Sequence, residues 1–231
     1  IYNTIKSNGA EGIYLDAVGV DDITISNNNI SLNGGSGIRG DELNSLLLIN
    51  ENVVSNNEGT GIYILRSLDS RITNNNIFSN NGGINVGLDD RTSGSNVTIS
   101  NNTVINNTYG LKVGGETSNE NTVSGATVES NTLKNNEGYG LRMWMSDSMI
   151  DKNLISGNGG DGIYLYDRCC PSNYGSNRNN ITNNTISNNG GDGIYVGSYS
   201  SNNTIKHNNI TGNDDYGIYS LSSVNATYNW W

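Results

Sequence analysis

A repeat with a period in the twenties runs through the chain and constrains its fold more than any other feature. The copy at residues 25–38 reads ISNNNISLNGGSGI. Each copy holds a first asparagine, a second asparagine five residues later, and a glycine followed by an aliphatic residue. A repeat of this length, sustained over a whole chain, is typical of a solenoid whose units pack on their neighbours.

Within each copy, the apolar residues alternate as they do in a β-strand. After the glycine they occupy every second position, as in Ile13 and Leu15 or Ile163 and Leu165. This period of two places them on one face of a strand, and no stretch shows a helical period. We therefore predict an all-β fold, a right-handed single-stranded parallel β-helix of about nine coils with three parallel sheets.

The recurring asparagines are predicted to hold the corners of the coil. Asparagine tolerates the left-handed backbone angles of a tight bend, and stacked asparagines can bond the amide of the next coil. Such a ladder satisfies polar groups that would otherwise be buried without a partner. The residues predicted to point inward as a ladder are Asn28, Asn52, Asn75, Asn102, Asn131, Asn153, Asn184 and Asn208.

Composition agrees with one thin-cored domain over residues 1–231. Only 33% of the residues are hydrophobic, but they fall at fixed phases, which argues against disorder. The formal net charge of −10 makes nucleic acid an unfavourable partner, and no stretch is apolar enough to span a membrane. Both ends stop at the same phase of the repeat without a cap. This predicts either an excerpt of a longer surface protein or a unit that associates head to tail.

The repeat and the closing segment at residues 225–231, NATYNWW, resemble the right-handed parallel β-helix repeats of the pectin-lyase-like superfamily. The resemblance is greatest to NosD-like and to archaeal or bacterial surface-protein versions. It implies the β-helix fold over essentially the whole chain. Lyases, epimerases, glycosidases, adhesins and surface-layer proteins share that fold, so function has to be argued from a site.

The third strand of each coil carries one outward residue between its two inward ones, and these residues are predicted to stack into a stripe. The stripe consists of Tyr14, Arg39, Tyr63, Asn85, Lys112, Arg142, Tyr164, Tyr195 and Tyr219. A second outward column contains Asp16, Asp41, Leu65, Trp144 and Tyr166. Aromatic rings cover the apolar faces of pyranoses, and Lys or Arg pairs with uronate carboxylates. Tyrosine is equally common on exposed strands that bind nothing.

We predict an extracellular or cell-surface protein that recognises a polysaccharide or cell-envelope glycan along this stripe. The residues predicted to bind it are Tyr63, Lys112, Arg142, Trp144, Tyr164, Tyr166 and Tyr195. Long insertions at residues 88–96, 114–126 and 167–180 all follow the third strand, so their loops are expected to wall a groove beside the stripe.

Two alternatives stay open: a structural surface-layer or filament subunit, and a polysaccharide lyase or other carbohydrate-active enzyme. For a lyase, the resemblance implies a basic residue that abstracts a proton, and the candidates are Lys112 and Arg142. Asp147 and Asp167 are the conceivable carboxylate pair of a glycosidase. The single histidine, His207, is expected at a solvent-facing corner.

No cofactor is certain, and calcium is a candidate. The adjacent acids Asp89–Asp90 and Asp214–Asp215 offer the oxygen ligands that calcium prefers, although solvated turns explain them equally well. The neighbouring residues Cys169 and Cys170 are predicted to form a vicinal disulfide or to remain loop thiols. Asn-x-Ser/Thr sequons, which can carry glycans in a secreted protein, begin at Asn29, Asn96, Asn101, Asn106, Asn180, Asn183, Asn202, Asn209 and Asn225.

Overall fold

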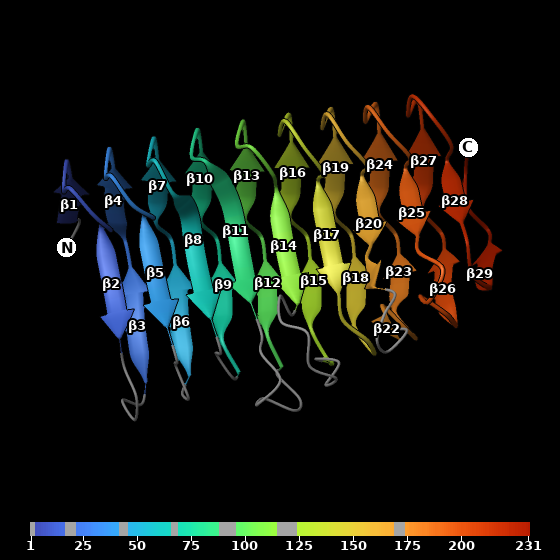
Figure 1. The fold of residues 1–231 in the computed structure, drawn as a ribbon, viewed down its shortest axis with the longest axis horizontal. Coiled ribbons are helices and arrows are strands. Elements are labelled where there is room, and N and C mark those ends of the chain that lie inside the picture. The colour runs from blue at the N-terminus through green and yellow to red at the C-terminus, as the bar shows by residue number, and fades with distance from the viewer. Residues whose placement is uncertain are drawn as a thin grey trace.

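The computed structural model describes residues 3–16, 22–41, 46–65, 69–87, 96–114, 124–168 and 174–231. In these ranges every regular element is a β-strand, and the strands stack into an elongated solenoid with the two chain ends at opposite ends (Figure 1). Within the same ranges, no helix has the length and apolar character needed to cross a lipid bilayer. The all-β solenoid expected from the repeat is therefore confirmed.

Each turn of the chain contributes one strand to each of three parallel sheets, which we call A, B and C in chain order. Sheet A consists of β1 (Asn3–Lys6), β4 (Asn28–Ser31), β7 (Val53–Ser55), β10 (Asn76–Phe78), β13 (Thr103–Ile105), β16 (Thr132–Lys134), β19 (Leu154–Ser156), β24 (Thr185–Ser187) and β27 (Asn209–Thr211). Sheet B consists of β2 (Ile13–Asp16), β5 (Ile38–Asp41), β8 (Thr60–Leu65), β11 (Gly82–Gly87), β14 (Leu111–Gly114), β17 (Leu141–Trp144), β20 (Ile163–Leu165), β25 (Ile194–Val196) and β28 (Ile218–Ser220). Sheet C consists of β3 (Ile23–Ser26), β6 (Leu47–Asn50), β9 (Arg71–Thr73), β12 (Thr98–Ser100), β15 (Thr127–Glu129), β18 (Met149–Asp151), β23 (Asn180–Thr182), β26 (Asn203–Lys206) and β29 (Val224–Thr227).

The number of coils differs slightly from the expected nine. Each sheet has nine strands, and nine strands are separated by eight steps, so the chain makes about eight turns between the first and last strand of a sheet. The prediction counted copies of the repeat, whereas a turn is the step from one copy to the next.

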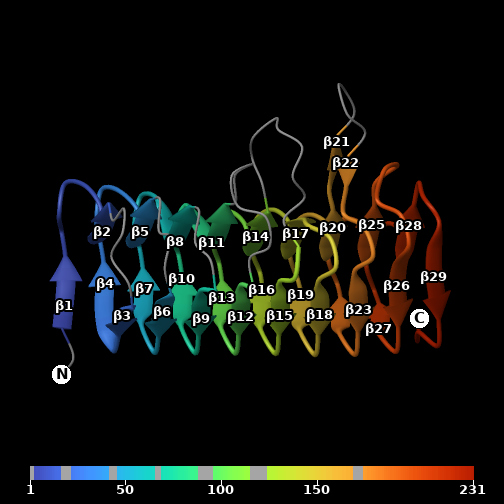
Figure 2. The same cartoon turned by 90° about the horizontal axis from the view of Figure 1, so that it is seen from below.

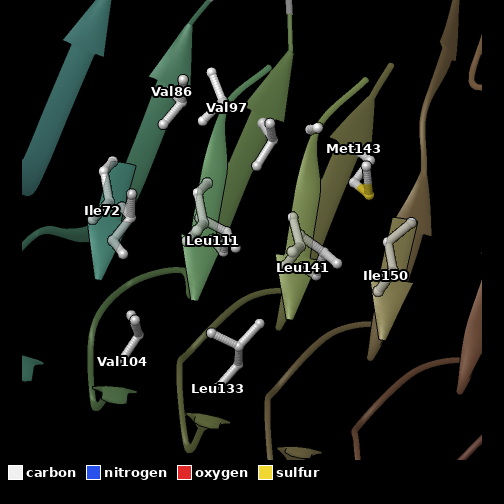
Figure 3. Close-up of a cluster of buried hydrophobic side chains, with 14 of the residues drawn as sticks. Ile72, Val86, Val97, Val104, Leu111, Leu133, Leu141, Met143 and Ile150 are labelled. Atoms are coloured by element: carbon white, nitrogen blue, oxygen red, sulfur yellow. The ribbon is translucent and has the colours of Figure 1, made fainter. Parts of the chain in front are cut away.

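The core is a single column of side chains enclosed by the three sheets. The inward residues of sheet A, such as Val104 and Leu133, point into the same interior as Leu111 and Leu141 of sheet B (Figure 3). All four are fully buried. Since each rung adds only a few such residues, a chain with little hydrophobic content still closes a continuous core.

The predicted asparagine ladder is confirmed as a continuous stack. At its centre, the backbone N–H and side-chain amide of Asn102 both donate to Oδ1 of Asn131, each at 3.0 Å. Asn131 repeats the same two bonds to Asn153, and its side chain also donates to the Ile99 carbonyl at 2.8 Å. All four residues are buried. The ladder therefore pairs polar groups inside the coil, as buried groups require.

The left-handed backbone belongs to a different residue from the one expected. At these corners the positive φ angle lies on the residue just before the ladder asparagine, for example 55° at Asn101 before Asn102 and 57° at His207 before Asn208. The two roles fall on neighbouring residues because the bend turns the side chain of the first residue outward and leaves that of the second pointing inward.

The second recurring asparagine, which the sequence pattern showed but did not assign to a ladder, forms one as well. It runs through Asn8, Asn33, Asn57, Asn80, Asn107, Asn136, Asn158, Asn189 and Asn213. A shorter stack joins Ser148, Asn179 and Asn203 through backbone N–H donors at the corner between sheets B and C. In the rungs of Ser148, Asn179 and Asn203, side-chain acceptors therefore hold all three corners of the coil.

The recurrent glycine is required by packing. A Cβ atom added to Gly110 would collide with the carbonyl oxygen of Gly140 on the next rung. A Cβ on Gly140 would meet the side chain of Ile155 and the ladder amide of Asn158. Only glycine therefore lets successive rungs approach at this corner, between sheets A and B.

The long connections fall where the insertions predicted them, between the strands of sheet B and those of sheet C. The described part of the last insertion forms the antiparallel hairpin of β21 (Asp167–Arg168) and β22 (Tyr174–Gly175), which projects from the solenoid (Figure 2). Most of the other two insertions, residues 88–95 and 115–123, lies outside the described residues.

Candidate functional site

The outward stripe of sheet B has the predicted register. Strand pairing places Arg142 beside Lys112 on β14 and beside Tyr164 on β20. Tyr164 in turn pairs with Tyr195, and Tyr195 with Tyr219. One side chain from each strand therefore stands in a single column along the sheet, spaced by about 4.8 Å.

The tyrosines of the later rungs form one continuous aromatic surface. The ring centroids of Tyr164 and Tyr195 are 4.9 Å apart in an edge-on arrangement, and those of Tyr195 and Tyr219 are 5.7 Å apart. The second outward column joins this surface, because Tyr166 lies 5.8 Å from Tyr164 and 5.3 Å from Trp144. These are favourable aromatic separations, and they hold the rings as a preformed platform.

Arg142 lies against this platform. Its Cζ atom is 4.1 Å from the ring centroid of Tyr166 and 5.9 Å from that of Tyr164. Within the described ranges no carboxylate pairs with Arg142, and the side chain is half-buried. Stacking on a ring fixes the guanidinium while leaving its N–H groups able to bind a carboxylate.

The first rungs of the stripe behave differently, because their polar groups bind each other. Arg39 forms an ion pair with Asp41 at 2.9 Å and with Glu11 at 3.5 Å, and it lies between the rings of Tyr14 and Tyr63. The Tyr14 hydroxyl donates to Asp41 at 3.1 Å, and this hydrogen bond raises the pKa of Tyr14. The charge of Arg39 is therefore compensated within the protein.

Asn85 adds little to the stripe. It pairs in register with Tyr63 and Lys112, as expected, but only 5% of its surface is exposed. Its short side chain lies between two longer ones. The expected stripe is consequently interrupted at β11, and its continuous part runs from Lys112 to Tyr219.

A third column, absent from the sequence-based site, borders the stripe at the corner between sheets A and B. It consists of the residues that precede the recurrent glycine: Glu11, Ser36, Thr60, Gly82, Tyr109, Tyr139, Asp161, Asp192 and Tyr216. Tyr109 and Tyr139 stack at 5.6 Å, and Tyr216 stacks on Tyr219 of the stripe at 5.4 Å. The fixed position before each glycine was the signal for this column in the sequence.

Two carboxylates of this third column are partly or fully buried. Oδ1 of Asp161 accepts the backbone N–H of Asp192 at 2.8 Å, and Oδ1 of Asp192 accepts that of Tyr216 at 3.0 Å. Burial raises the pKa of both acids, and neighbouring carboxylates, including Asp215, raise it further.

The catalytic candidates come from different parts of the coil. Asp147 lies at the corner before sheet C, where Arg178 binds both of its oxygens at 2.7 and 2.6 Å. This hydrogen bonding lowers the pKa of Asp147, which keeps the carboxylate ionised and disfavours it as a general acid. Asp167 lies instead on the β21 hairpin, where its carboxylate accepts the N–H of Tyr199 at 3.2 Å. Lys112 and Arg142, the candidate bases, are neighbours on the stripe.

The candidate calcium ligands Asp214 and Asp215 are exposed in the turn before β28. Among the described residues, no three acid, histidine or cysteine side chains are grouped so as to hold a metal ion. Asp89, Asp90, Cys169 and Cys170 lie outside those residues. His207 is exposed at a corner and stacks on Tyr228 at 5.5 Å, which confirms its expected place.

Comparison with known proteins agrees with this architecture. A family model described as a right-handed beta helix region matches residues 1–149 and 121–229. The chain belongs to the right-handed β-helix family. This confirms the resemblance drawn from the repeat and gives the hand of the coil. A search of curated proteins by sequence finds no significant match.

Several solved structures are similar to the β-helix. The A-module of the mannuronan C-5 epimerase AlgE6 from Azotobacter vinelandii has a TM-score of 0.70 at 16% identity, covering 96% of this chain and 66% of that one. The AlgE4 A-module from the same organism has a TM-score of 0.62 at 19% identity, covering 90% of this chain and 64% of that one. A variant of the periplasmic alginate epimerase AlgG has a TM-score of 0.63 at 20% identity, covering 96% of this chain and 50% of that one. The chain thus spans about two thirds or less of their length, and at these identities the likeness shows the fold.

Proposed function

We propose that the protein recognises a polysaccharide along the stripe of sheet B, from Lys112 to Tyr219. The observation that carries this proposal is the combination, on one face of sheet B, of a preformed aromatic surface with a stacked guanidinium. Aromatic rings bind the apolar faces of sugar rings, and an arginine fixed on a ring is well placed to bind a sugar carboxylate. The alternative is that the tyrosines are present only because tyrosine favours exposed strands. That alternative does not explain why Arg142 stacks among them without a carboxylate partner in the described residues.

The similar structures support the same class of ligand. Mannuronan and alginate, from which the epimerases take their names, are polysaccharides. The support is indirect, because these proteins share the fold with this chain and only a fifth or less of its sequence.

We further propose that residues 1–231 act as one β-helix unit of a protein located outside the cytoplasm, at the cell surface or in the envelope. The unbroken run of all three sheets supports a single unit. A polymer that coats or surrounds cells is accessible only from that side, which supports the location. The periplasmic location of the similar epimerase AlgG agrees with it.

The proposal is tested by measuring the binding of the purified chain to an array of neutral and acidic polysaccharides, and then titrating the ones that bind. The variants Tyr164→Ala and Arg142→Gln are expected to weaken binding at least several-fold, because each removes one of the two contacts. Phe78→Ala on sheet A and Arg71→Gln on sheet C are the matched controls, since they lie on the other faces. Equal losses in the controls, or no binding to any polysaccharide, would contradict the proposal.

The same experiment separates binding from catalysis. Acidic polysaccharides that bind are incubated with the protein, with and without calcium, and assayed for unsaturated products. Binding without turnover supports a recognition module, whereas turnover supports a polysaccharide lyase. Binding to nothing, together with filaments visible by electron microscopy, supports a structural subunit.

A further inference from the structure

We infer that the protein itself carries N-linked glycans, attached at those sequons whose asparagine amide is exposed and makes no hydrogen bond, and that the outward columns of sheet B stay bare. This inference rests on the proposed location outside the cytoplasm and does not need polysaccharide binding. The attachment sites are Asn29 and Asn209 on sheet A, Asn180 and Asn225 on sheet C, and Asn101, Asn106 and Asn202 at the corners.

The coil turns the first and third residues of each sequon outward. On a strand this follows from the period of two, so Asn180 and Thr182 of β23 flank the buried Ile181. At a corner, the residue with positive φ faces solvent and the ladder residue after it points inward, as in exposed Asn101 and buried Asn102. In all nine sequons the asparagine is exposed and the serine or threonine is not buried. An attached glycan would therefore project into solvent and leave the core undisturbed.

The hydroxyl of the third residue lies within reach of the asparagine side chain. On β29, Oγ1 of Thr227 donates a hydrogen bond to Oδ1 of Asn225 at 3.4 Å. The contact arises because residues two apart on a strand stand on the same face. It joins the carboxamide and the hydroxyl that the sequon requires, and it leaves Nδ2 of Asn225 exposed.

The amide nitrogen is the atom to which the sugar becomes bonded. The donor is a sugar activated as a phosphate or pyrophosphate ester. A bond forms from its anomeric carbon to Nδ2, the carbon–oxygen bond to the phosphate breaks with the electron pair left on the phosphate, and Nδ2 loses one proton. At the seven sites, Nδ2 donates no hydrogen bond to any residue that the structure describes.

The amides of the other two sequons are already bonded to carboxylates. Nδ2 of Asn96 donates to Asp69 at 3.1 Å, and Nδ2 of Asn183 donates to the buried Asp151 at 2.7 Å. A sugar on either nitrogen would have to fit beside the carboxylate that the amide faces. We therefore expect Asn96 and Asn183 to remain unmodified.

The sites are distributed unevenly around the coil. In its nine strands, sheet B contains one asparagine, Asn85, and the residue two positions later is Gly87, which has no hydroxyl group. The outward positions of sheets A and C hold many asparagine, serine and threonine residues, and the sequons arise there and at the corners. Glycans attached at these positions would cover two faces of the coil and leave the aromatic platform of sheet B accessible.

The test is tandem mass spectrometry of peptides from the protein purified from the organism that produces it. Sugar masses are expected on Asn101 and Asn106 and not on Asn135. Asn135 is the matched control, because it follows a sheet A strand as Asn106 does, with φ of 53° against 54°, and is also exposed. It differs in having Glu137 two positions later, where Asn106 has a threonine. Sugar on Asn135, or the absence of sugar from all seven sites, would overturn the inference.

Two variants made in the same organism test the role of the hydroxyl group. Thr108→Val keeps Asn106 and removes the hydroxyl two positions later, so the sugar should be lost from Asn106 and retained at Asn101. Thr108→Ser keeps the hydroxyl and should keep the sugar. Thr108 is exposed, so both variants should fold, as melting curves would verify. Sugar that persists on Asn106 in the valine variant would contradict the assignment.

Failure of this inference can be told apart from failure of the proposed function. Protein recovered from the medium or the cell envelope without any sugar would contradict the glycans and leave the proposed location standing. Recovery from the cytoplasm alone would contradict both. Polysaccharide binding is measured separately on the array, where the wild type and Thr108→Val should bind alike. Binding that becomes several-fold tighter in this variant would show that the sugar on Asn106 covers the stripe, and the bare face would be wrong.

Discussion

At the level of single residues, each corner of the coil assigns separate tasks to neighbouring residues. Asn101 adopts the left-handed angle and faces solvent, whereas Asn102 points inward and joins the ladder. Both are asparagines, so residue type alone does not distinguish the two roles. Glu51, Lys152 and Tyr228 at equivalent bends show that the outer position accepts many side chains, while the inner one remains asparagine.

Replacing the ladder residue Asn131 with leucine is expected to lower the free energy of unfolding by about 1–3 kcal/mol. The substitution leaves the N–H of Asn102 and the carbonyl of Ile99 buried without their partners. Urea denaturation followed by circular dichroism measures the change. Lys134→Gln, an exposed substitution in the same turn, is the control, and an Asn131→Leu variant as stable as this control would refute the ladder's role.

Replacing Gly110 with alanine is expected to destabilise the fold by about 1–3 kcal/mol, because the new methyl group overpacks the corner. The clash involves the backbone oxygen of Gly140, which cannot move without displacing the next rung. Gly9→Ala is the matched control, since a Cβ there meets nothing within 4 Å. Equal melting temperatures for the two variants would show that the glycine serves some other purpose.

At the level of the element, sheet B differs from sheets A and C in what borders it. Its outward column is flanked on one side by the corner column and on the other by Trp144, Tyr166 and the β21–β22 hairpin. In every turn the parallel strands project their outward side chains in the same direction, so the three columns together form a continuous surface. The corner column adds the buried acid Asp192, whose ionisation should be measurable.

Burial raises the pKa of Asp192 in the folded state. The Asp192 carboxyl therefore makes its full contribution to the free energy of unfolding below its ordinary pKa of about 4, and this contribution is lost as the pH rises through the folded-state pKa. The variant Asp192→Asn stays neutral and keeps the acceptor for the Tyr216 N–H. Its melting temperature relative to the wild type is therefore expected to increase from about pH 3 to about pH 7. A difference that stays constant over this range would contradict the assignment.

Asp151 provides the opposite case. Burial raises its pKa, but hydrogen bonds from Lys152, Asn183 and Thr182 lower it by more, and the net pKa is lowered. Its contribution is therefore present above the ordinary pKa and lost as the pH falls. Asp151→Asn should be less stable than the wild type near neutral pH, and the two melting curves should converge on acidification.

At the level of the whole molecule, the solenoid presents side chains at regular intervals along its axis. The continuous part of the stripe spans the five strands β14, β17, β20, β25 and β28, each one rung from the next. A linear glycan lying along the axis would place about one sugar on each rung of about 4.8 Å. Because each rung offers one outward side chain per column, a glycan gains affinity only by contacting several rungs along its length.

Affinity is consequently expected to increase with each added sugar up to a length of about five and then to level off, because longer chains extend beyond the stripe. Calorimetry with a length series of the best-binding oligosaccharide measures this dependence. A disaccharide that binds as tightly as a hexasaccharide would show that the ligand contacts one rung or lies across the strands.

The strands, their pairing and the composition of the outward columns could be predicted from the residue pattern. Period-two alternation and the asparagine and glycine spacing are local features, and a coil that repeats them brings equal phases into register. The pairing of Lys112 with Arg142 and of Tyr164 with Tyr195 follows from this alone.

Which members of a column are available to a ligand depended on the folded arrangement. Arg39 and Arg142 share one phase and one residue type, yet the first pairs with Glu11 from another turn and the second stacks on Tyr166. Such differences arise between side chains on different rungs and columns, whose contacts depend on rotamers and close packing. The repeat pattern determines the position at which a side chain leaves the backbone. The neighbours that stacking places around it determine its conformation and whether its charge is paired.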